Sequence, residues 1–501
     1  WSSDVCSSDL SVTNLASGQT GYSRDYFLLS FRGEGFDPGR LSDLSFFNEE
    51  NGLFDVCDCD IDGDGLNDLI TTNNSEDAFS TSITIFRNTT ADNSLTPGFQ
   101  RINDPDLNIA NAARNLTCGD LDGDGKPELV VGKGGNNADR IYIFKNQSTV
   151  GAVNYAPFVA VQLSENATAS GTRKLKIHDM DVDGRPDIIM TDQGSGKIFV
   201  FRNEGAQGQI NFPNTSRFII TTSGPSLGLE VADMNGDNRP EIVYGSNLSA
   251  DVFIVKNNSA PGSLSFGTPQ RIAVDGDLVN LVLADLDIDG DLDIAVANFV
   301  NNIFILRNTS SSGNISVSAP IVYETGRLPW GLAVGDLDGN GKPDLVVTTN
   351  DEVDKITVFQ NKSDGGTLSL TGYEIGEANI SRNIRITDIN GDARPDVVYT
   401  TDEINQVQLL RNQHCVRPGL GPDNPPKICD GKTVTLQATR ALKSTYEWYD
   451  ANGAISGAPD QPTYDASTAG VYSVRLFNTT DNCAYTSNEI TIQSRSEEHT
   501  S

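Results

Sequence analysis

The sequence contains few of the residues on which many functions depend. It has 7 cysteines and 3 histidines in 501 residues, and 68 Asp and Glu residues outnumber 36 Lys and Arg residues. The resulting formal charge of -32 would repel nucleic acid phosphates and anionic lipid surfaces, so neither is an expected partner. No apolar run is long enough to span a bilayer, so we expect no membrane insertion.

The two ends of the chain differ from the rest. Residues 1–10 and 495–501 resemble translated sequencing-adapter sequence of the kind found at the ends of metagenome-derived proteins. We therefore treat both segments as non-native and leave them out of the reasoning about the fold. The remaining length exceeds that of one ordinary domain, which predicts at least two domains.

One acidic segment is repeated seven times along the chain. Each copy has Asp or Asn at positions 1, 3 and 5, Asp or Glu at position 9, and an apolar run directly afterwards. The copies begin 51 to 60 residues apart, at Asp60, Asp120, Asp179, Asp233, Asp285, Asp336 and Asp388. A period of this length is typical of propellers and solenoids.

The spacing of the acidic side chains predicts an oxygen cage for a hard cation. Ca²⁺ takes about six to eight oxygen ligands, and side chains at positions 1, 3, 5 and 9 with the carbonyl of position 7 would supply them. An EF-hand would need Glu at position 12, and none of the seven copies has it. The predicted ligands, for up to seven Ca²⁺ ions, are Asp60, Asp62, Asp64, Leu66, Asp68; Asp120, Asp122, Asp124, Lys126, Glu128; Asp179, Asp181, Asp183, Arg185, Asp187; Asp233, Asn235, Asp237, Arg239, Glu241; Asp285, Asp287, Asp289, Asp291, Asp293; Asp336, Asp338, Asn340, Lys342, Asp344; and Asp388, Asn390, Asp392, Arg394, Asp396.

Position 6 of the segment must turn sharply, which favours a residue that tolerates positive φ. Five copies have Gly there, whereas the fourth has Asn238 and the seventh has Ala393. Ala tolerates this conformation poorly, so we expect the seventh site to be strained by roughly 1 kcal/mol and to be the weakest.

The residues around each acidic segment predict four strands per repeat. A strand-like run precedes the segment and another follows it, as in Leu281–Leu283 and Asp293–Ala297. A third run ends in a basic residue or Gln followed by Asn, as in Ile83–Asn88, and a weaker fourth run follows. Seven such units predict an all-β, seven-bladed β-propeller over residues 11–414.

The last repeat is one strand short, because the chain turns into a Pro/Gly-rich linker after Asn412. Residues 35–41 and 44–47 precede the first acidic segment and are expected to supply the missing strand and close the ring. An open solenoid is the alternative. Sequons recur at the same repeat position at Asn88, Asn146, Asn308 and Asn361, which favours a structural role for this Asn over glycosylation.

These residues resemble the FG-GAP or VCBS repeat family over residues 35–412. This is the β-propeller repeat of integrin alpha subunits and of many bacterial secreted proteins. The resemblance implies Ca²⁺ between the first and second strands of each blade, with partner binding on the opposite face. Degenerate Phe-Gly and Ala-Pro signatures, as in Ser265–Pro269, favour the VCBS branch over an integrin.

A separate C-terminal domain is predicted after a linker at residues 415–427. Strand-like runs within residues 428–494, with Trp448 as core aromatic, resemble the immunoglobulin-like β-sandwiches of bacterial surface proteins. Cys429 and Cys483 flank these strands and are a plausible disulfide. The sequence indicates no pairing for Cys57, Cys59, Cys118 and Cys415.

Catalytic groups are hard to assemble from this sequence. Gly224–Gly228 matches a nucleophile-elbow pattern, but it lies between repeats without the required helix. His178 and His414 are expected on the surface, so no catalytic residue is predicted.

We expect a secreted or cell-surface, calcium-binding module that acts in adhesion by binding a glycan or a protein. The alternative is a polysaccharide-degrading, lyase-like enzyme or its accessory carbohydrate-binding part. Arg327 and Trp330 are candidates for the ligand face, opposite the calcium loops, although Trp330 could instead pack between blades.

Overall fold

The structure is a computed structural model that describes residues 36–48, 52–73, 82–90, 97–102, 107, 109, 113–134, 140–162, 171–192, 195–246, 248–311, 313–350, 355–377, 381–392, 394–401, 405–414, 420–421, 428, 433–438, 444–478 and 483–493. Within these ranges the regular structure is β-strand, with short 3-10 turns at Pro38–Arg40 (η1) and Asn214–Ser216 (η3). The described residues contain no helix long and apolar enough to cross a membrane.

Strands β1–β28 form seven four-stranded antiparallel sheets, which we number in chain order. Their bounds are β2 (Leu53–Cys59), β3 (Asp68–Asn73), β4 (Ile83–Asn88) and β5 (Phe99–Ile102) in sheet 1; β6 (Ala113–Gly119), β7 (Glu128–Lys133), β8 (Arg140–Phe144) and β9 (Val159–Gln162) in sheet 2; β10 (Thr172–His178), β11 (Asp187–Asp192), β12 (Lys197–Phe201) and β13 (Arg217–Thr221) in sheet 3; β14 (Ser226–Ala232), β15 (Glu241–Ser246), β16 (Asp251–Val255) and β17 (Gln270–Ala273) in sheet 4; β18 (Leu278–Ala284), β19 (Asp293–Asn298), β20 (Asn302–Leu306) and β21 (Ile321–Glu324) in sheet 5; β22 (Pro329–Gly335), β23 (Asp344–Thr349), β24 (Lys355–Asn361) and β25 (Leu370–Glu377) in sheet 6; and β26 (Ser381–Thr387), β27 (Asp396–Thr401), β28 (Gln406–Asn412) and β1 (Leu41–Asn48) in sheet 7. This confirms the predicted all-β fold built from repeated four-stranded units.

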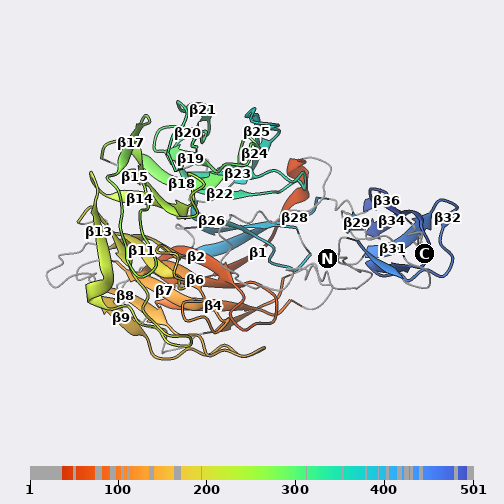
Figure 1. The fold of residues 1–501 in the computed structure, drawn as a ribbon, viewed down its shortest axis with the longest axis horizontal. Coiled ribbons are helices and arrows are strands. Elements are labelled where there is room, and N and C mark those ends of the chain that lie inside the picture. The colour runs from red at the N-terminus through yellow and green to blue at the C-terminus, as the bar shows by residue number, and fades with distance from the viewer. Residues whose placement is uncertain are drawn as a thin grey trace, which may run out of the picture.

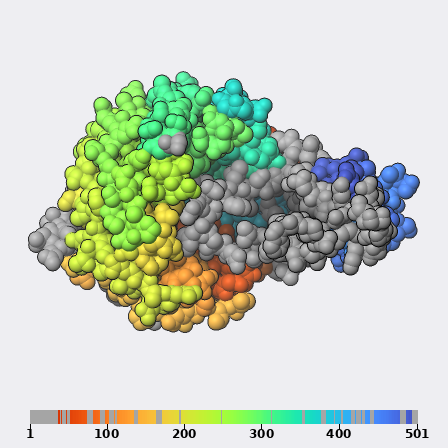
Figure 2. Space-filling model, viewed as in Figure 1, coloured from red at the N-terminus to blue at the C-terminus, as the bar shows by residue number. Residues whose placement is uncertain are grey.

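The sheets follow one another around a common axis, as the colour sequence in Figures 1 and 2 shows. The first strand of each sheet contacts the first strand of the next, and β26 of sheet 7 contacts β2 of sheet 1. The seven first strands therefore surround the axis, and the ring of a β-propeller is closed.

An N-terminal strand closes the ring. β1 pairs antiparallel with β28, with Leu41 opposite Asn412, so the beginning of the described chain completes the last sheet. The ring of Phe47 in β1 then packs on Phe86 and Phe99 of sheet 1, with centroids 5.1 and 4.9 Å apart. The predicted closing strand is confirmed, and the open-solenoid alternative is wrong.

The hydrophobic core lies between neighbouring sheets. Each of seven clusters combines fully buried side chains of two successive sheets, such as Ile143 of sheet 2 with Ile188 of sheet 3. Burial of one such side chain contributes roughly 1.5 to 3 kcal/mol. The second and third strands are buried on both faces for this reason, as β11 and β16 illustrate.

Strands β29–β36 form a second unit. β29 (Leu420–Gly421), β30 (Val434–Ala438) and β33 (Thr463–Ala466) make one sheet, while β31 (Ser444–Asp450), β32 (Gly453–Ala454), β34 (Gly470–Asn478), β35 (Cys483–Thr486) and β36 (Ile490–Ile492) make the other. Both sheets contribute to one core, where Leu436, Trp448 and Val474 are at most 1% exposed. The immunoglobulin-like assignment stays a prediction, and the proposed Cys429–Cys483 disulfide falls outside the described side chains.

Candidate metal centres

Each acidic segment forms the hairpin loop between the first and second strands of its sheet. In sheet 1, β2 ends at Cys59, the loop begins at Asp60, and position 9 is Asp68, the first residue of β3. The same boundaries recur in all seven sheets. Because the first strands run side by side around the axis, all seven loops lie on one face, as predicted.

Backbone N–H groups of the loop hold the carboxylates of positions 1 and 9. Asp60 Oδ1 accepts a hydrogen bond from the Gly63 N–H at 2.8 Å, and its Oδ2 accepts one from the Gly65 N–H at 2.8 Å. Asp68 accepts from the Ile61 N–H at 2.9 Å and from the Asn88 N–H at 2.6 Å. The loop is thus folded around its own acidic side chains.

The turn at position 6 has the predicted left-handed backbone. φ lies between 81° and 100° at the five glycines, and Asn238 has φ 64°. Ala393 lies outside the described residues, so the strain expected there stays a prediction. Position 4 is also left-handed, which the sequence reasoning missed, and two copies place β-branched residues there, Val182 at 57° and Ile288 at 61°.

Carboxylates from different positions of the same loop lie close together. In the first three loops one oxygen each from positions 1, 3 and 9 lies within 4.8 Å of the others; in the fifth, positions 1, 3 and 5 do so. These groups are Asp60, Asp62, Asp68; Asp120, Asp122, Glu128; Asp179, Asp181, Asp187; and Asp285, Asp287, Asp289. The geometry fits a cation, whereas the full ligand set with the position 7 carbonyls stays a prediction.

Burial raises the pKa of the carboxyl group at position 9. The pKa rises to about 7 at Asp68 and Asp293 and to about 8 at Glu128, Asp187 and Glu241, chiefly through desolvation and in part through the neighbouring loop carboxylates. These groups are therefore at most about half ionised at neutral pH by themselves. A bound cation would supply the opposite charge that keeps them ionised.

Two buried oxygens at position 3 fit a cation directly. Asp181 and Asp287 are both 0% exposed, and their Oδ1 atoms have no hydrogen-bond donor among the described residues. A buried carboxylate oxygen without a partner carries a large desolvation cost. A hard divalent cation with oxygen preference, such as Ca²⁺ or Mg²⁺, would remove that cost.

The other oxygen of position 3 faces a basic side chain from the third strand. Arg202 Nε donates to Asp181 Oδ2 at 2.6 Å, and Arg87 and Lys145 contact Asp62 and Asp122 in the same way. From the sequence, this basic residue was recognised only as part of the end of a strand. Its constant place before the Asn was the signal that could have revealed the ion pair.

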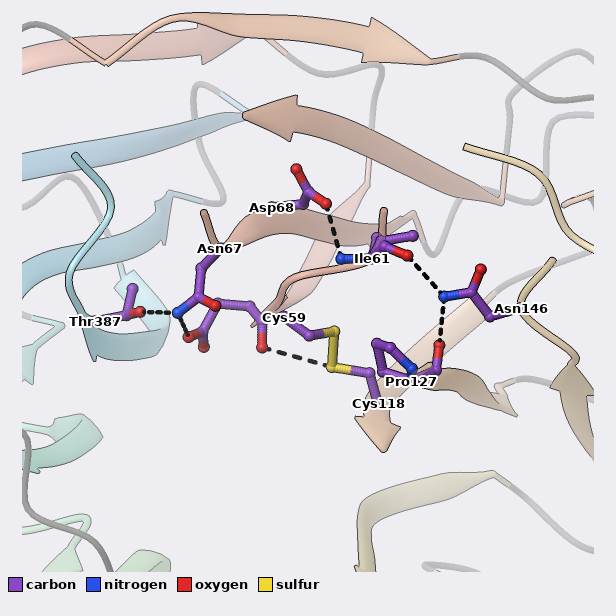
Figure 3. The surroundings of a disulfide bond; sticks show 9 residues. Cys59, Ile61, Asn67, Asp68, Cys118, Pro127, Asn146 and Thr387 are labelled. Carbon is purple, nitrogen blue, oxygen red and sulfur yellow. Dashed lines mark hydrogen bonds between the residues drawn. A yellow bond between two sulfur atoms is a disulfide. The ribbon is translucent and has the colours of Figure 1, made fainter. Parts of the chain in front are cut away.

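The repeated Asn links each loop to the loop of the preceding sheet. Asn146 Nδ2 donates to the Ile61 carbonyl of the first loop at 2.8 Å and to the Pro127 carbonyl of its own loop at 3.0 Å (Figure 3). Equivalent bonds to the preceding loop are made by all seven residues, which are at most 3% exposed: Asn88, Asn146, Asn203, Asn257, Asn308, Asn361 and Asn412. This agrees with the structural role inferred from the sequons.

A disulfide joins sheets 1 and 2 beside the first loop. Cys59 and Cys118 are bonded across 59 residues (Figure 3). The thiol of Cys57 is free and buried. No partner was predicted for Cys59 or Cys118 from the sequence. The available signal was their near-equivalent placement at the ends of first strands in successive repeats.

The serine of the Gly224–Gly228 pattern and the two histidines considered above all make contacts within the fold. Ser226 is the first residue of β14, 2% exposed, and its hydroxyl donates to the Gly228 carbonyl at 2.9 Å. His414 is 2% exposed, so its expected surface position was wrong: it packs under the N-terminal segment, where its Nε2 accepts the Asp37 N–H at 2.7 Å. His178 is half-buried rather than exposed.

The candidate ligand-face residues lie at the start of β22. Arg327 is exposed, and Trp330 is half-buried with its ring edge-on to Phe299 at a centroid distance of 5.1 Å. Trp330 is therefore neither fully buried between sheets nor free of packing.

Comparison with known proteins agrees with this architecture. The family model described as FG-GAP-like repeat matches residues 60–131, 179–244, 233–296, 285–347 and 336–399, which together include all seven acidic loops. The chain is also similar to cartilage acidic protein 1 of Xenopus tropicalis, with 24% identity over 347 residues, covering 63% of this chain and 51% of that protein. The chain thus spans about half the length of this relative. It belongs to the FG-GAP-like repeat family.

Proposed function

We propose that the seven acidic loops bind Ca²⁺ and that the ring acts outside the cell as a non-enzymatic binding module. The observation that carries the calcium part is the group of carboxylates within 4.8 Å, with buried position 3 oxygens that lack donors. Ca²⁺ suits the site better than Mg²⁺, because Ca²⁺ accepts irregular cages of many oxygens and Mg²⁺ demands a near-ideal octahedron.

An extracellular setting is supported by three features. The Cys59–Cys118 disulfide favours an oxidising compartment. The name of the relative, cartilage acidic protein 1, refers to an extracellular tissue and to an acidic protein. This chain is also acidic, with a net charge of -32. Free Ca²⁺ is also abundant outside cells, where sites of modest affinity would be filled.

The face opposite the acidic loops is the proposed binding surface for a glycan or a protein. The first strands begin there, and Trp330 and Arg327 lie at the start of β22. A half-buried aromatic ring beside exposed polar groups is the composition typical of ligand contacts. A non-enzymatic role is supported by the buried, backbone-bonded hydroxyl of Ser226.

Two measurements test the proposal. Elemental analysis after equilibrium dialysis should find several Ca²⁺ ions per chain, and a glycan array probed with and without Ca²⁺ should show calcium-dependent binding. A chain that retains no Ca²⁺ at millimolar concentration contradicts the metal assignment. Polysaccharide cleavage by the purified chain would contradict the non-enzymatic role.

A further inference from the structure

A cavity of about 160 Å³ lies on the axis of the ring, at the ends of the first strands remote from the acidic loops. All seven first strands contribute to its wall, each through its second or third residue. The acidic loops follow the last residues of the same strands. The cavity therefore opens on the face that we propose for ligand binding.

A repeated backbone irregularity shapes this wall. In every first strand the pairing with the second strand shifts register after the first residue. The residues passed over by the pairing, such as Arg173 in β10 and Trp330 in β22, line the cavity. A β-bulge re-aims a side chain at such a rim, so the fold directs one group from each sheet toward the axis.

The cavity carries positive charge in an otherwise acidic protein. The described residues of its wall include Arg173 and Lys174 and no carboxylate. The two carboxylates that act on the charge of Lys174 have other partners: Asp55 lies 3.7 Å from Arg385, and Glu230 lies 2.6 Å from Lys176. Among the described residues, none forms an ion pair with the Lys174 ammonium.

The surroundings of Lys174 lower the pKa of its side chain. The pKa falls to about 8, chiefly through desolvation and in part through the cations Arg385 and Lys176, while Asp55 and Glu230 oppose the shift. The group is still mostly protonated at neutral pH. Lys174 is half-buried. An ammonium that is partly withdrawn from water without a counter-ion costs stability, and an anionic ligand would reduce that cost.

The side-chain amide of Asn115, also in the cavity wall, has an oxygen that can accept a hydrogen bond from a ligand hydroxyl. Asn115 is 3% exposed, and its Nδ2 donates to Asp55 Oδ2 at 3.1 Å, which fixes the orientation of the amide. Its Oδ1 is then buried with no donor among the described residues. The wall also offers the aromatic rings of Phe54, Phe299 and Trp330.

We propose that this cavity binds a carboxylated sugar residue, with the carboxylate on Arg173 and Lys174 and a ring hydroxyl donating to Asn115 Oδ1. The inference rests on the proposed binding function and names its ligand class. An aspartate or glutamate side chain would supply a carboxylate but would bring no hydroxyl for Asn115. A sugar ring offers the carboxylate, the hydroxyls and an apolar face for the aromatic rings together.

Calorimetric titration of the calcium-loaded full chain tests this with a matched pair of ligands. p-Nitrophenyl β-D-glucuronide and p-nitrophenyl β-D-glucoside differ only in the carboxylate. The glucuronide should bind at least about tenfold more tightly, which corresponds to one charge-assisted contact. Equal affinities would overturn the proposal, and so would tighter binding of a tetra-aspartate peptide than of the glucuronide.

Lys174→Met should abolish the preference for the glucuronide and leave the glucoside unchanged. Lys197→Met is the control, because Lys197 begins β12 on the same face and lies outside the cavity wall. Lys174→Met should also raise the melting temperature, because it removes a half-buried charge that has no ion-pair partner among the described residues, so lost affinity cannot be attributed to unfolding. If Lys197→Met also lost the preference for the glucuronide over the glucoside, the preference would reflect only the general positive charge of this face. That result would overturn the assignment of the carboxylate to Lys174.

The pH dependence gives an independent readout. Affinity for the glucuronide should fall as the pH rises through about 8 in the wild type, while Lys174→Arg should bind without this fall. If the affinity of the wild type for the glucuronide did not change between pH 7 and pH 9.5, the role of Lys174 would be contradicted. If the glycan array shows no binding of any class, the proposed function itself fails, whereas binding of neutral glycans alone removes only the carboxylate assignment.

Discussion

At the scale of single residues, the acidic loops combine a shared geometry with local strain. Position 4 has a left-handed backbone in every loop, and five copies place Gly there. Val182 and Ile288 occupy the same position at φ 57° and 61°, where their branched side chains crowd the backbone. The third and fifth loops therefore carry strain at position 4, where the other five have Gly.

Replacement of Ile288 by Gly should relieve this strain. We expect Ile288→Gly to raise the free energy of unfolding by up to about 1 kcal/mol in saturating Ca²⁺, because the relief exceeds the entropy that Gly adds to the unfolded chain. Urea unfolding measures the change. Gly290→Ala in the same loop, at φ 100°, should have the opposite sign. A loss of stability in Ile288→Gly would show that packing of the Ile side chain outweighs the strain.

The residue pattern predicted part of this site. Alternating acidic positions and the need for a turn at position 6 follow from local chemistry, so both could be recognised in the sequence. The ion pair between Arg202 and Asp181 and the Cys59–Cys118 disulfide depend on which strands become neighbours. Such contacts are set by the tertiary fold, which explains why sequence reasoning missed them.

At the scale of the elements, the Asn at the end of the third strand couples neighbouring sheets. Asn257 Nδ2 donates to the Met180 carbonyl of the third loop at 2.8 Å and to the Pro240 carbonyl of its own loop at 3.0 Å. Its own N–H donates to Glu241 at position 9 of the fourth loop. Each candidate metal loop is thus held by its own sheet and by the next one.

Asn257→Ala should destabilise the protein by about 2 to 4 kcal/mol, because it leaves two buried carbonyls without donors. Asn258→Ala is the matched control, since Asn258 is the adjacent residue and is exposed. Chemical unfolding in saturating Ca²⁺ gives both values. Similar losses in the two variants would contradict the linking role of Asn257.

The closure of the ring depends on a buried histidine. His414 Nε2 accepts the Asp37 N–H, and the His414 N–H donates to Asn412 Oδ1 at 3.0 Å. Burial lowers the pKa of His414 to about 4, with the positive charges of Arg40 and Arg394 adding to the effect and Asp37 opposing it. The folded state therefore needs the neutral ring.

Acid should weaken this closure. Between pH 6.5 and about 4 the unfolded chain binds a proton at His414 that the folded chain refuses, so stability falls as the pH falls. The loss from this group approaches roughly 3 kcal/mol at pH 4. We expect the stability difference between wild type and His414→Gln to shrink by this amount between pH 7 and pH 4. A difference that is constant with pH would exclude His414 as the titrating group.

At the scale of the whole molecule, the repeated sheets and the closure of the ring could both be predicted from the sequence. The last repeat lacks one strand and the N-terminal segment has one to spare, so pairing of β1 with β28 satisfies both. The cavity on the axis could not be predicted, because it depends on where seven bulged residues meet. Sequence periodicity identifies the sheets, and only their arrangement around the axis brings Trp330, Lys174 and Asn115 together.

We expect metal binding in the seven loops to stabilise the whole ring. Each filled loop adds about 2.7 kcal/mol to the folded state when free Ca²⁺ exceeds its dissociation constant a hundredfold. Without Ca²⁺, each loop gathers carboxylates whose repulsion and desolvation oppose folding. The Asn links between loops extend this effect from sheet to sheet.

Differential scanning calorimetry in excess Ca²⁺ and in excess chelator tests the calcium assignment most directly. The structure predicts a much lower melting temperature for β1–β28 in chelator, restored by Ca²⁺ and poorly by Mg²⁺. The same transition temperature in chelator and in excess Ca²⁺ would contradict calcium binding by the acidic loops.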